Sequence, residues 1–288
     1  MPGFLYDYAT FSERFETPIV KSKDKNASDK LKQMVGPFIL RRLKAEVLKD
    51  LPEKLEEVRY ARFDETQRKV YDGQVVLMRN LIGKSTKAGE EKLRILAELT
   101  RLREICCDPS LILENYQGGS AKRDACMELV ESAIGGGHRM LLFSQFTSML
   151  EILEKELKDR NIEYYKITGS TPKEQRLKLV NQFNEGTVPV FLISLKAGGT
   201  GLNLTGADVV IHYDPWWNLA VQNQATDRAH RIGQKNKVTV YRMIIKDTIE
   251  EKILAMQEAK KDLADEILSG EGKSLFALST EELLDLLN

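Results

Sequence analysis

The chain has 288 residues, of which 42% are hydrophobic and 30% are charged, a composition typical of an ordinary folded domain. Its 43 Lys and Arg residues balance 43 Asp and Glu residues, which excludes a protein that attracts nucleic acid through its net charge. Three cysteines and three histidines, without metal-ligand spacing, argue against a disulfide framework or a zinc site. We find no signal-peptide pattern or membrane-length apolar run, and expect a cytoplasmic protein, nucleoid-associated in a prokaryote or nuclear in a eukaryote.

Residues 1–50 resemble a junction or linker more than the start of a domain. They contain apolar residues that need a partner surface from elsewhere: Phe11, Phe15, Pro18 and Ile19. Residues 51–118 form the next region, a strand followed by a helical protrusion. Segment 55–63 alternates imperfectly between apolar and polar residues and predicts a strand. Residues 64–67 are typical of a helix N-terminus, and two apolar stripes at helical spacing follow.

Residues 119–288 show a regular alternation of strands and helices. The expected strands are 140–146, 164–168, 188–193, 207–213 and 238–244. The expected helices are 122–134, 148–160, 172–184, 219–232, 248 to about 268, and a short one after Ser279. Three helices begin with a predicted cap: Ser148 with Glu151, Thr171 with Glu174, and Thr248 with Glu251. Strongly apolar strands in this order indicate an α/β fold with a parallel sheet covered by helices on both faces.

Ligands of open α/β sheets bind beyond the carboxyl ends of the strands. The residues expected there are polar, glycine-rich or aromatic: Ser144-Gln145, Gly169-Ser170-Thr171, Ser194 to Gly201, and Asp214 to Trp217. Gly169 to Thr171 also precede a helix, whose N-terminus favours an anion, although Ser170 and Thr171 could simply cap it. The glycines at 198, 199 and 201 permit close approach to a ligand, or form only a tight turn.

Segment 219–232 carries Gln224, Arg228 and Arg231 at positions i, i+4 and i+7. On a continuous helix these three side chains project from one face. Two guanidinium groups three residues apart suit a shared polyanion such as a triphosphate, and a solvated arginine face is the alternative.

Several motifs resemble, in the same order, those of the Swi/Snf family of helicase-like, double-stranded-DNA-dependent ATPases. The most specific are D-P-W-W-N at 214–218 and Q-A-T-D-R-A-H-R-I-G-Q at 224–234, and the others are F-I-L-R-R, L-P-E-K, L-R-E-I-C-C-D-P, L-L-F-S-Q-F, I-T-G-S-T and S-L-K-A-G-G-T-G-L-N-L. The chain is similar to that family's C-terminal lobe. The resemblance implies a RecA-like sheet with a helical family-specific insertion, and ATP and Mg²⁺ as cofactors. It implies as partners the double-stranded DNA backbone, an N-terminal RecA-like lobe of the same polypeptide and a DNA-bound protein complex, but no membrane.

The same resemblance assigns roles to residues. Arg228 and Arg231 would be arginine fingers at the γ-phosphate, and Gln224 would help to position them. Gly201 and Asn203 would face the nucleotide. The residues expected along the DNA backbone, in sequence-independent contacts, are Ser144, Gln145, Gly169, Ser170, Thr171, Ser194 and Lys196.

Two family motifs do not occur in this chain, namely the phosphate loop and the D-E-x-H magnesium carboxylates of the N-terminal lobe. Gly83-Lys84-Ser85 matches the end of a phosphate loop, but Met78 replaces the glycine required five residues earlier. We therefore expect a fragment or one half of a larger protein, inactive as an ATPase by itself. The alternatives are a non-catalytic RecA-like module that binds DNA or protein and, less readily without a phosphate loop, an independent nucleotide-binding enzyme.

Overall fold

The computed structural model describes residues 4–22, 24–38, 51–81, 88–197 and 201–267. The chain divides into two compact units, and the larger of them includes Asp50–Glu258. The smaller combines Met1–Lys49 with a segment that begins at Ala259. The loop with Gly83-Lys84-Ser85 and the helix expected after Ser279 lie outside the described residues.

The described part of the smaller unit is largely helical. It contains α1 (Tyr8–Phe11), the π-helical turn η1 (Ser12–Glu16), α2 (Thr17–Ser22), α3 (Lys25–Val35) and the 3-10 turn η2 (Gly36–Phe38). Asp24 caps α3, because its carboxylate accepts a hydrogen bond from the Asn26 backbone N–H at 2.8 Å. Phe15 and Ile19, two of the apolar residues expected to need a partner surface, are buried. The described part of the segment that the sequence suggests as a linker, residues 4–22 and 24–38, is thus largely helical.

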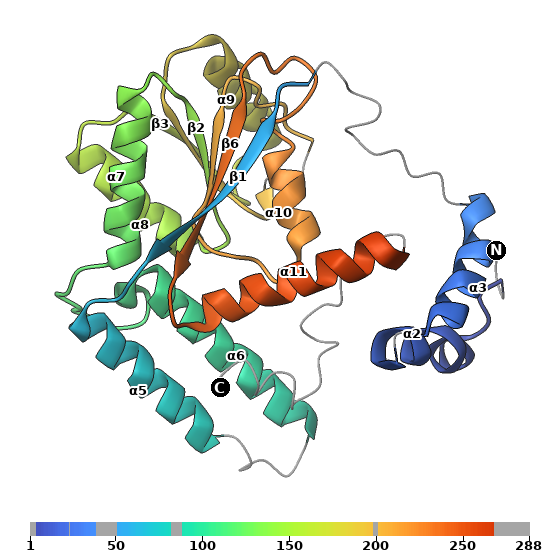
Figure 1. The fold of residues 1–288 in the computed structure, drawn as a ribbon. Coiled ribbons are helices and arrows are strands. Elements are labelled where there is room, and N and C mark those ends of the chain that lie inside the picture. The colour runs from blue at the N-terminus through green and yellow to red at the C-terminus, as the bar shows by residue number, and fades with distance from the viewer. Residues whose placement is uncertain (1–3, 23, 39–50, 82–87, 198–200, 268–288) are drawn as a thin grey trace. The chain divides into compact units, whose positions relative to one another are not determined.

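The larger unit is built on a six-stranded sheet of order β1-β6-β5-β2-β4-β3, in which every neighbouring pair is parallel (Figure 1). The strands are β1 (Lys54–Ala61), β2 (Met140–Ser144), β3 (Tyr164–Ile167), β4 (Val190–Ser194), β5 (Val209–His212) and β6 (Val238–Ile245). The predicted α/β fold with a parallel sheet is confirmed. Strand β1, which the sequence predicts at 55–63 ahead of the helical protrusion, joins the same sheet, with Lys54 opposite Val238.

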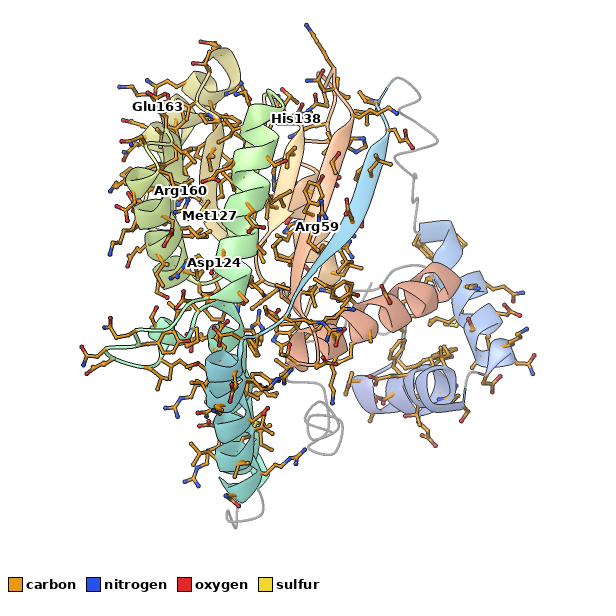
Figure 2. All side chains as sticks on the ribbon, turned by 60° about the vertical axis from the view of Figure 1, so that its left-hand side comes forward. Arg59, Asp124, Met127, His138, Arg160 and Glu163 are labelled. Atoms are coloured by element: carbon orange, nitrogen blue, oxygen red, sulfur yellow. The ribbon has the colours of Figure 1, made fainter. Side chains whose placement is uncertain are left out.

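Helices cover both faces of the sheet because successive strand residues point to opposite sides. Met140 and Leu142 of β2 pack on the face covered by α7 (Ala121–Gly135) and α8 (Thr147–Asp159). Leu141 and Phe143 pack on the other face, with α9 (Lys173–Glu185) and α10 (Leu219–Thr226). Figure 2 labels Met127 on α7, and this side chain is buried in the first of these two cores.

A third apolar cluster lies among α5 (Glu65–Leu81), α6 (Ala88–Cys107) and α11 (Ile249–Ile267), and a 3-10 turn η3 (Pro109–Leu111) follows α6. Figure 1 shows α5 and α6 running side by side below the sheet. Asp64 caps α5 as expected, since its Oδ1 accepts from the Gln67 N–H at 2.7 Å. The cluster joins α6 to α11 through residues such as Leu102 and Ile253.

The capping boxes predicted for α8 and α9 are wrong, whereas the Thr248 hydroxyl caps α11 as expected by accepting from the Glu250 N–H at 3.2 Å. Helix α8 begins at Thr147, and neither it nor α9 has a side-chain cap hydrogen bond. Pro172, with extended backbone, occupies the cap position of α9. The Thr171 hydroxyl instead accepts from the Thr168 N–H at 3.0 Å, within the preceding turn. Short polar side chains satisfy nearby backbone groups of either a turn or a helix, and here the turn prevails for Thr171.

Candidate functional site

The last residues of the neighbouring strands β2 and β4 are buried, contrary to the expectation that they contact DNA. Ser144 is 0% exposed, and its hydroxyl donates to Asp214 Oδ1 at 2.6 Å. Ser194, opposite it in the sheet, is also buried, and its Oγ accepts from the Ala197 N–H at 3.4 Å. These hydroxyls shape the loops that follow instead of facing solvent, because both residues still belong to the covered part of the sheet.

The accessible polar residues at the carboxyl edge lie one or more positions after the last residue of each strand. Gly169, Ser170 and Lys196 are exposed, whereas Gln145 and Thr171 are partly buried. Arg176 of α9, which the sequence did not single out, holds this part of the edge. Its guanidinium donates to the carbonyls of Thr168 (3.1 Å), Gly169 (2.9 Å) and Thr171 (2.7 Å). Arg176 thereby anchors the turn formed by residues 169–171 to α9.

Helix α10 ends six residues earlier than expected. It starts at Leu219, is capped by Asn218, whose Oδ1 accepts from the Ala220 N–H at 3.0 Å, and its last residue is Thr226. Gln224 lies exposed in the last turn of α10, but Arg228 and Arg231 lie in the turns that follow. The prediction that all three project from one helical face is therefore wrong. We call residues 227–234 the arginine turn.

A buried glutamine holds the arginine turn. The Gln234 amide nitrogen donates to the carbonyls of Ala207 (2.7 Å), Ala229 (3.1 Å) and Thr205 (3.2 Å). Its amide oxygen accepts from two backbone N–H groups of the next residues, both at 2.9 Å. Gly233 supplies a left-handed backbone conformation, with φ of 101°. The contacts of Gln234 hold the arginine turn beside the residues that lead into β5.

The glycine-rich segment between β4 and β5 contacts the arginine turn. Residues 198–200 lie outside the described part, and Gly201 has φ of 57° and is exposed, as is Asn203. The N–H of Leu204, next to Asn203, donates to the Arg228 carbonyl at 2.9 Å. Since β4 and β5 are parallel, this segment returns from the carboxyl edge to the amino edge of the sheet. The residues expected to face the nucleotide thus lie beside the two arginines, at the amino edge of the sheet. The residues expected to contact DNA lie at the opposite, carboxyl edge.

The two arginines differ in environment. Arg228 is 6% exposed, whereas Arg231 is exposed. Burial lowers the pKa of Arg228, the neighbouring Arg231 lowers it further, and Asp227 opposes the shift. Within the described residues, Arg228 Nε has no hydrogen-bond partner. A pair of mutually repelling cations with an unused donor is suited to bind an anion with several negative oxygens.

The sequence reasoning missed a buried polar network behind the carboxyl edge. Its ionic members are Arg103, Asp214, Lys122 and Glu250. Burial raises the pKa of Asp214, and the Arg103 guanidinium opposes this effect. The motif L-R-E-I-C-C-D-P contains Arg103 and D-P-W-W-N begins with Asp214, so the family motifs were the only available signal.

Metal-binding chemistry has no support in the described residues. Among them, no group of three or more His, Cys, Asp or Glu residues is arranged to hold a metal ion. The three cysteines are buried and free, and burial raises the pKa of the Cys126 thiol to about 12. No described helix has the length and apolar character required to cross a membrane.

Comparisons with known proteins identify the family. Residues 121–233 match the helicase conserved C-terminal domain, and residues 1–111 match the SNF2-related domain. The SWI2/SNF2 ATPase C-terminal domain of Sulfolobus solfataricus superposes with a TM-score of 0.66 and 33% identity, over 81% of this chain and 98% of that one. The chain belongs to the SWI2/SNF2 family of ATPases. The ATPase core of the same archaeal protein, solved in complex with double-stranded DNA, has a TM-score of 0.68 and 34% identity over 99% of this chain and 61% of that one.

Longer relatives of this SWI2/SNF2 chain include a Bacillus subtilis protein named as an ATP-dependent helicase/translocase. It is 41% identical over 99% of this chain, which spans 32% of its length. Human TATA-binding protein-associated factor 172 is 33% identical over 99% of this chain, which spans 19% of its length. The chain thus corresponds to about a third or less of these two relatives.

Proposed function

We propose that this chain is the second motor lobe of an ATP-driven translocase or remodeller of double-stranded DNA. The observation that carries the proposal is the arginine turn. Gln234 holds Arg228 and Arg231 beside the segment with Gly201 and Asn203, in a chain of the SWI2/SNF2 family.

The arginine turn would act at the γ-phosphate of ATP. When bound, ATP would supply the phosphoryl group and Mg²⁺ would neutralise part of its charge, and a partner lobe with a phosphate loop would hold most of both. Arg228 and Arg231 would stabilise the negative charge that develops on the transferring phosphoryl oxygens. Gln224, in the last turn of α10 and four residues before Arg228, would help to orient them. This lobe alone supplies only half of such a site and would not turn over ATP.

The carboxyl edge would follow the DNA backbone. Its accessible residues, Gln145, Gly169, Ser170, Thr171 and Lys196, offer backbone N–H groups, small polar side chains and one cation. Such groups bind phosphates without reading sequence, and the affinity falls as salt rises. The DNA complex of the Sulfolobus relative supports this role. The names of the TATA-binding protein-associated factors point to a DNA-bound protein complex as the object of remodelling.

Substitution of one arginine distinguishes the role of the arginine turn in ATP turnover from the role of the carboxyl edge in DNA binding. In the protein with both lobes, Arg231→Ala should lower DNA-stimulated ATP turnover at least about 10³-fold, the usual contribution of an arginine finger. DNA binding, measured by fluorescence anisotropy, should stay within twofold. Lys235→Ala removes an exposed positive charge four residues away and serves as the matched control. An equal loss of DNA affinity would refute the finger assignment, and unchanged turnover would favour a non-catalytic binding module.

A further inference from the structure

Arg103, near the end of α6, is a buried cation at the carboxyl edge. It is 2% exposed, its Nη2 donates to the Pro215 carbonyl at 2.6 Å, and the same nitrogen lies 3.6 Å from Asp214 Oδ2. Its guanidinium also lies 5.4 to 5.5 Å from the ring centroids of Phe146, Trp216 and Trp217. One side chain from the helical insertion thus contacts both the β2–α8 loop and the β5–α10 loop.

Asp214 joins these two loops directly. Its Oδ1 accepts from the Ser144 hydroxyl at 2.6 Å and from the Gln145 N–H at 3.2 Å. We call Gln145–Phe146 and Asp214–Asn218 the edge loops. Because Arg103 faces Asp214 and also holds Pro215, the relative position of the edge loops depends on this guanidinium.

The second edge loop leads to the arginine turn. Asn218 caps α10, which has eight residues and is therefore about 12 Å long. The arginine turn follows at the far end of this helix. On the opposite side of the loop, Gln257 of α11 donates to the Trp216 carbonyl and to Gln222 Oε1. A displacement of the edge loops would thus be transmitted through α10 to Arg228 and Arg231.

We propose that Arg103 is a positioning residue that couples DNA binding at the carboxyl edge to ATP turnover at the arginine turn. Arg103 is buried and would act through its neighbours, by keeping the Gln145 loop and the start of α10 in one relative position. Burying a cation beside one carboxylate gives little net stability, since desolvation offsets much of the attraction. What the contacts do provide is a fixed geometry between two loops. This inference rests on the proposed function.

The test compares variants of the protein with both lobes. Arg103→Met leaves Asp214 buried without its cation and should unfold more easily, so the informative variant is Arg103→Met/Asp214→Asn, which removes both charges. Arg101→Met is the matched control, because Arg101 lies on the same helix with its side chain 57% exposed. Three quantities are measured: the melting temperature, DNA affinity by anisotropy, and the ratio of ATP turnover with saturating DNA to turnover without DNA.

We expect the double variant to melt within a few degrees of the wild type and to bind DNA within about twofold. Its turnover ratio should fall about tenfold, inside the usual range of coupling between two sites. Arg103→Lys, which keeps the charge opposite Asp214, should recover part of the ratio. Arg101→Met should change nothing.

Two results would overturn the role of Arg103. One is a double variant with restored melting temperature and a wild-type turnover ratio, since Arg103 would then only stabilise the fold. The other is a loss of DNA affinity large enough to account for the whole fall in the turnover ratio. A wild-type protein without DNA-stimulated turnover would refute the proposed function itself, an outcome distinct from either.

Discussion

The buried ion pair between Lys122 and Glu250 offers a sharp test of how α7 is joined to α11. Both side chains are 0% exposed, and Lys122 Nζ bonds both carboxylate oxygens of Glu250. Glu250 Oε2 also accepts from the Ile245 N–H at 2.9 Å, at the end of β6. Burial lowers the pKa of Lys122, but Glu250, Cys107 and Cys106 together outweigh this and raise it, while burial raises the pKa of Glu250 against the effect of Lys122.

Lys122→Met should lower the free energy of unfolding by about 3–5 kcal/mol, because it leaves a buried carboxylate without its cation. That is a large share of the roughly 5–15 kcal/mol that stabilises a typical domain. Lys122→Met/Glu250→Gln removes both charges, and the new amide can still accept from the Ile245 N–H. We therefore expect the double variant to recover at least half of the loss.

Urea unfolding followed by circular dichroism gives these free energies by linear extrapolation. Lys158→Met is the control, since Lys158 pairs with Glu154 at 3.1 Å with its side chain 61% exposed, and should cost at most about 1 kcal/mol. A loss below about 1 kcal/mol for Lys122→Met would refute the reasoning. So would a double variant as unstable as the sum of the two single variants.

Three further predictions concern the larger unit. His212 is buried against Thr226, and burial lowers its pKa to about 3, so only the unfolded chain takes up a proton as the pH falls from about 6.5. Stability should therefore drop by about 2 kcal/mol from pH 7 to pH 5, and the difference between wild type and His212→Gln in urea unfolding at both pH values checks it. Gln234→Ala, which removes the side-chain donor of the Thr205 and Ala207 carbonyls and one of the two donors of the Ala229 carbonyl, should cost about 3 kcal/mol in the same assay and lower ATP turnover by disordering the arginine turn; normal turnover would contradict this. Asn218→Ala removes the cap of α10 and should cost about 1 kcal/mol, whereas no change would show the cap to be dispensable.

The strands could be predicted because their signal is local. Runs such as Met140–Phe143 are apolar throughout, so they require cover on both faces, and the parallel sheet supplies it. Strand ends were less clear, because hydropathy does not show where burial stops. Ser144 and Ser194 are polar yet lie within the covered sheet, and the sequence suggested that they contact DNA.

Features set by distant partners could not be read from local patterns. The spacing of Gln224, Arg228 and Arg231 fits a helix, but Gln234 holds carbonyls more than 20 residues upstream, at Thr205 and Ala207, and the helix ends at Thr226. Arg103 and Pro215 are 112 residues apart in sequence and meet through a single hydrogen bond. Motif resemblance marked both segments without showing that they touch.

The central claim is that this chain supplies the arginine half of an ATPase site. The most direct measurement is steady-state ATP hydrolysis, with and without double-stranded DNA, by the 288-residue chain and by a protein that joins it to a lobe with a phosphate loop and a D-E-x-H motif. The account predicts negligible turnover by the chain alone and DNA-stimulated turnover by the joined protein, abolished by Arg231→Ala. Substantial DNA-stimulated hydrolysis by the 288 residues alone would contradict it.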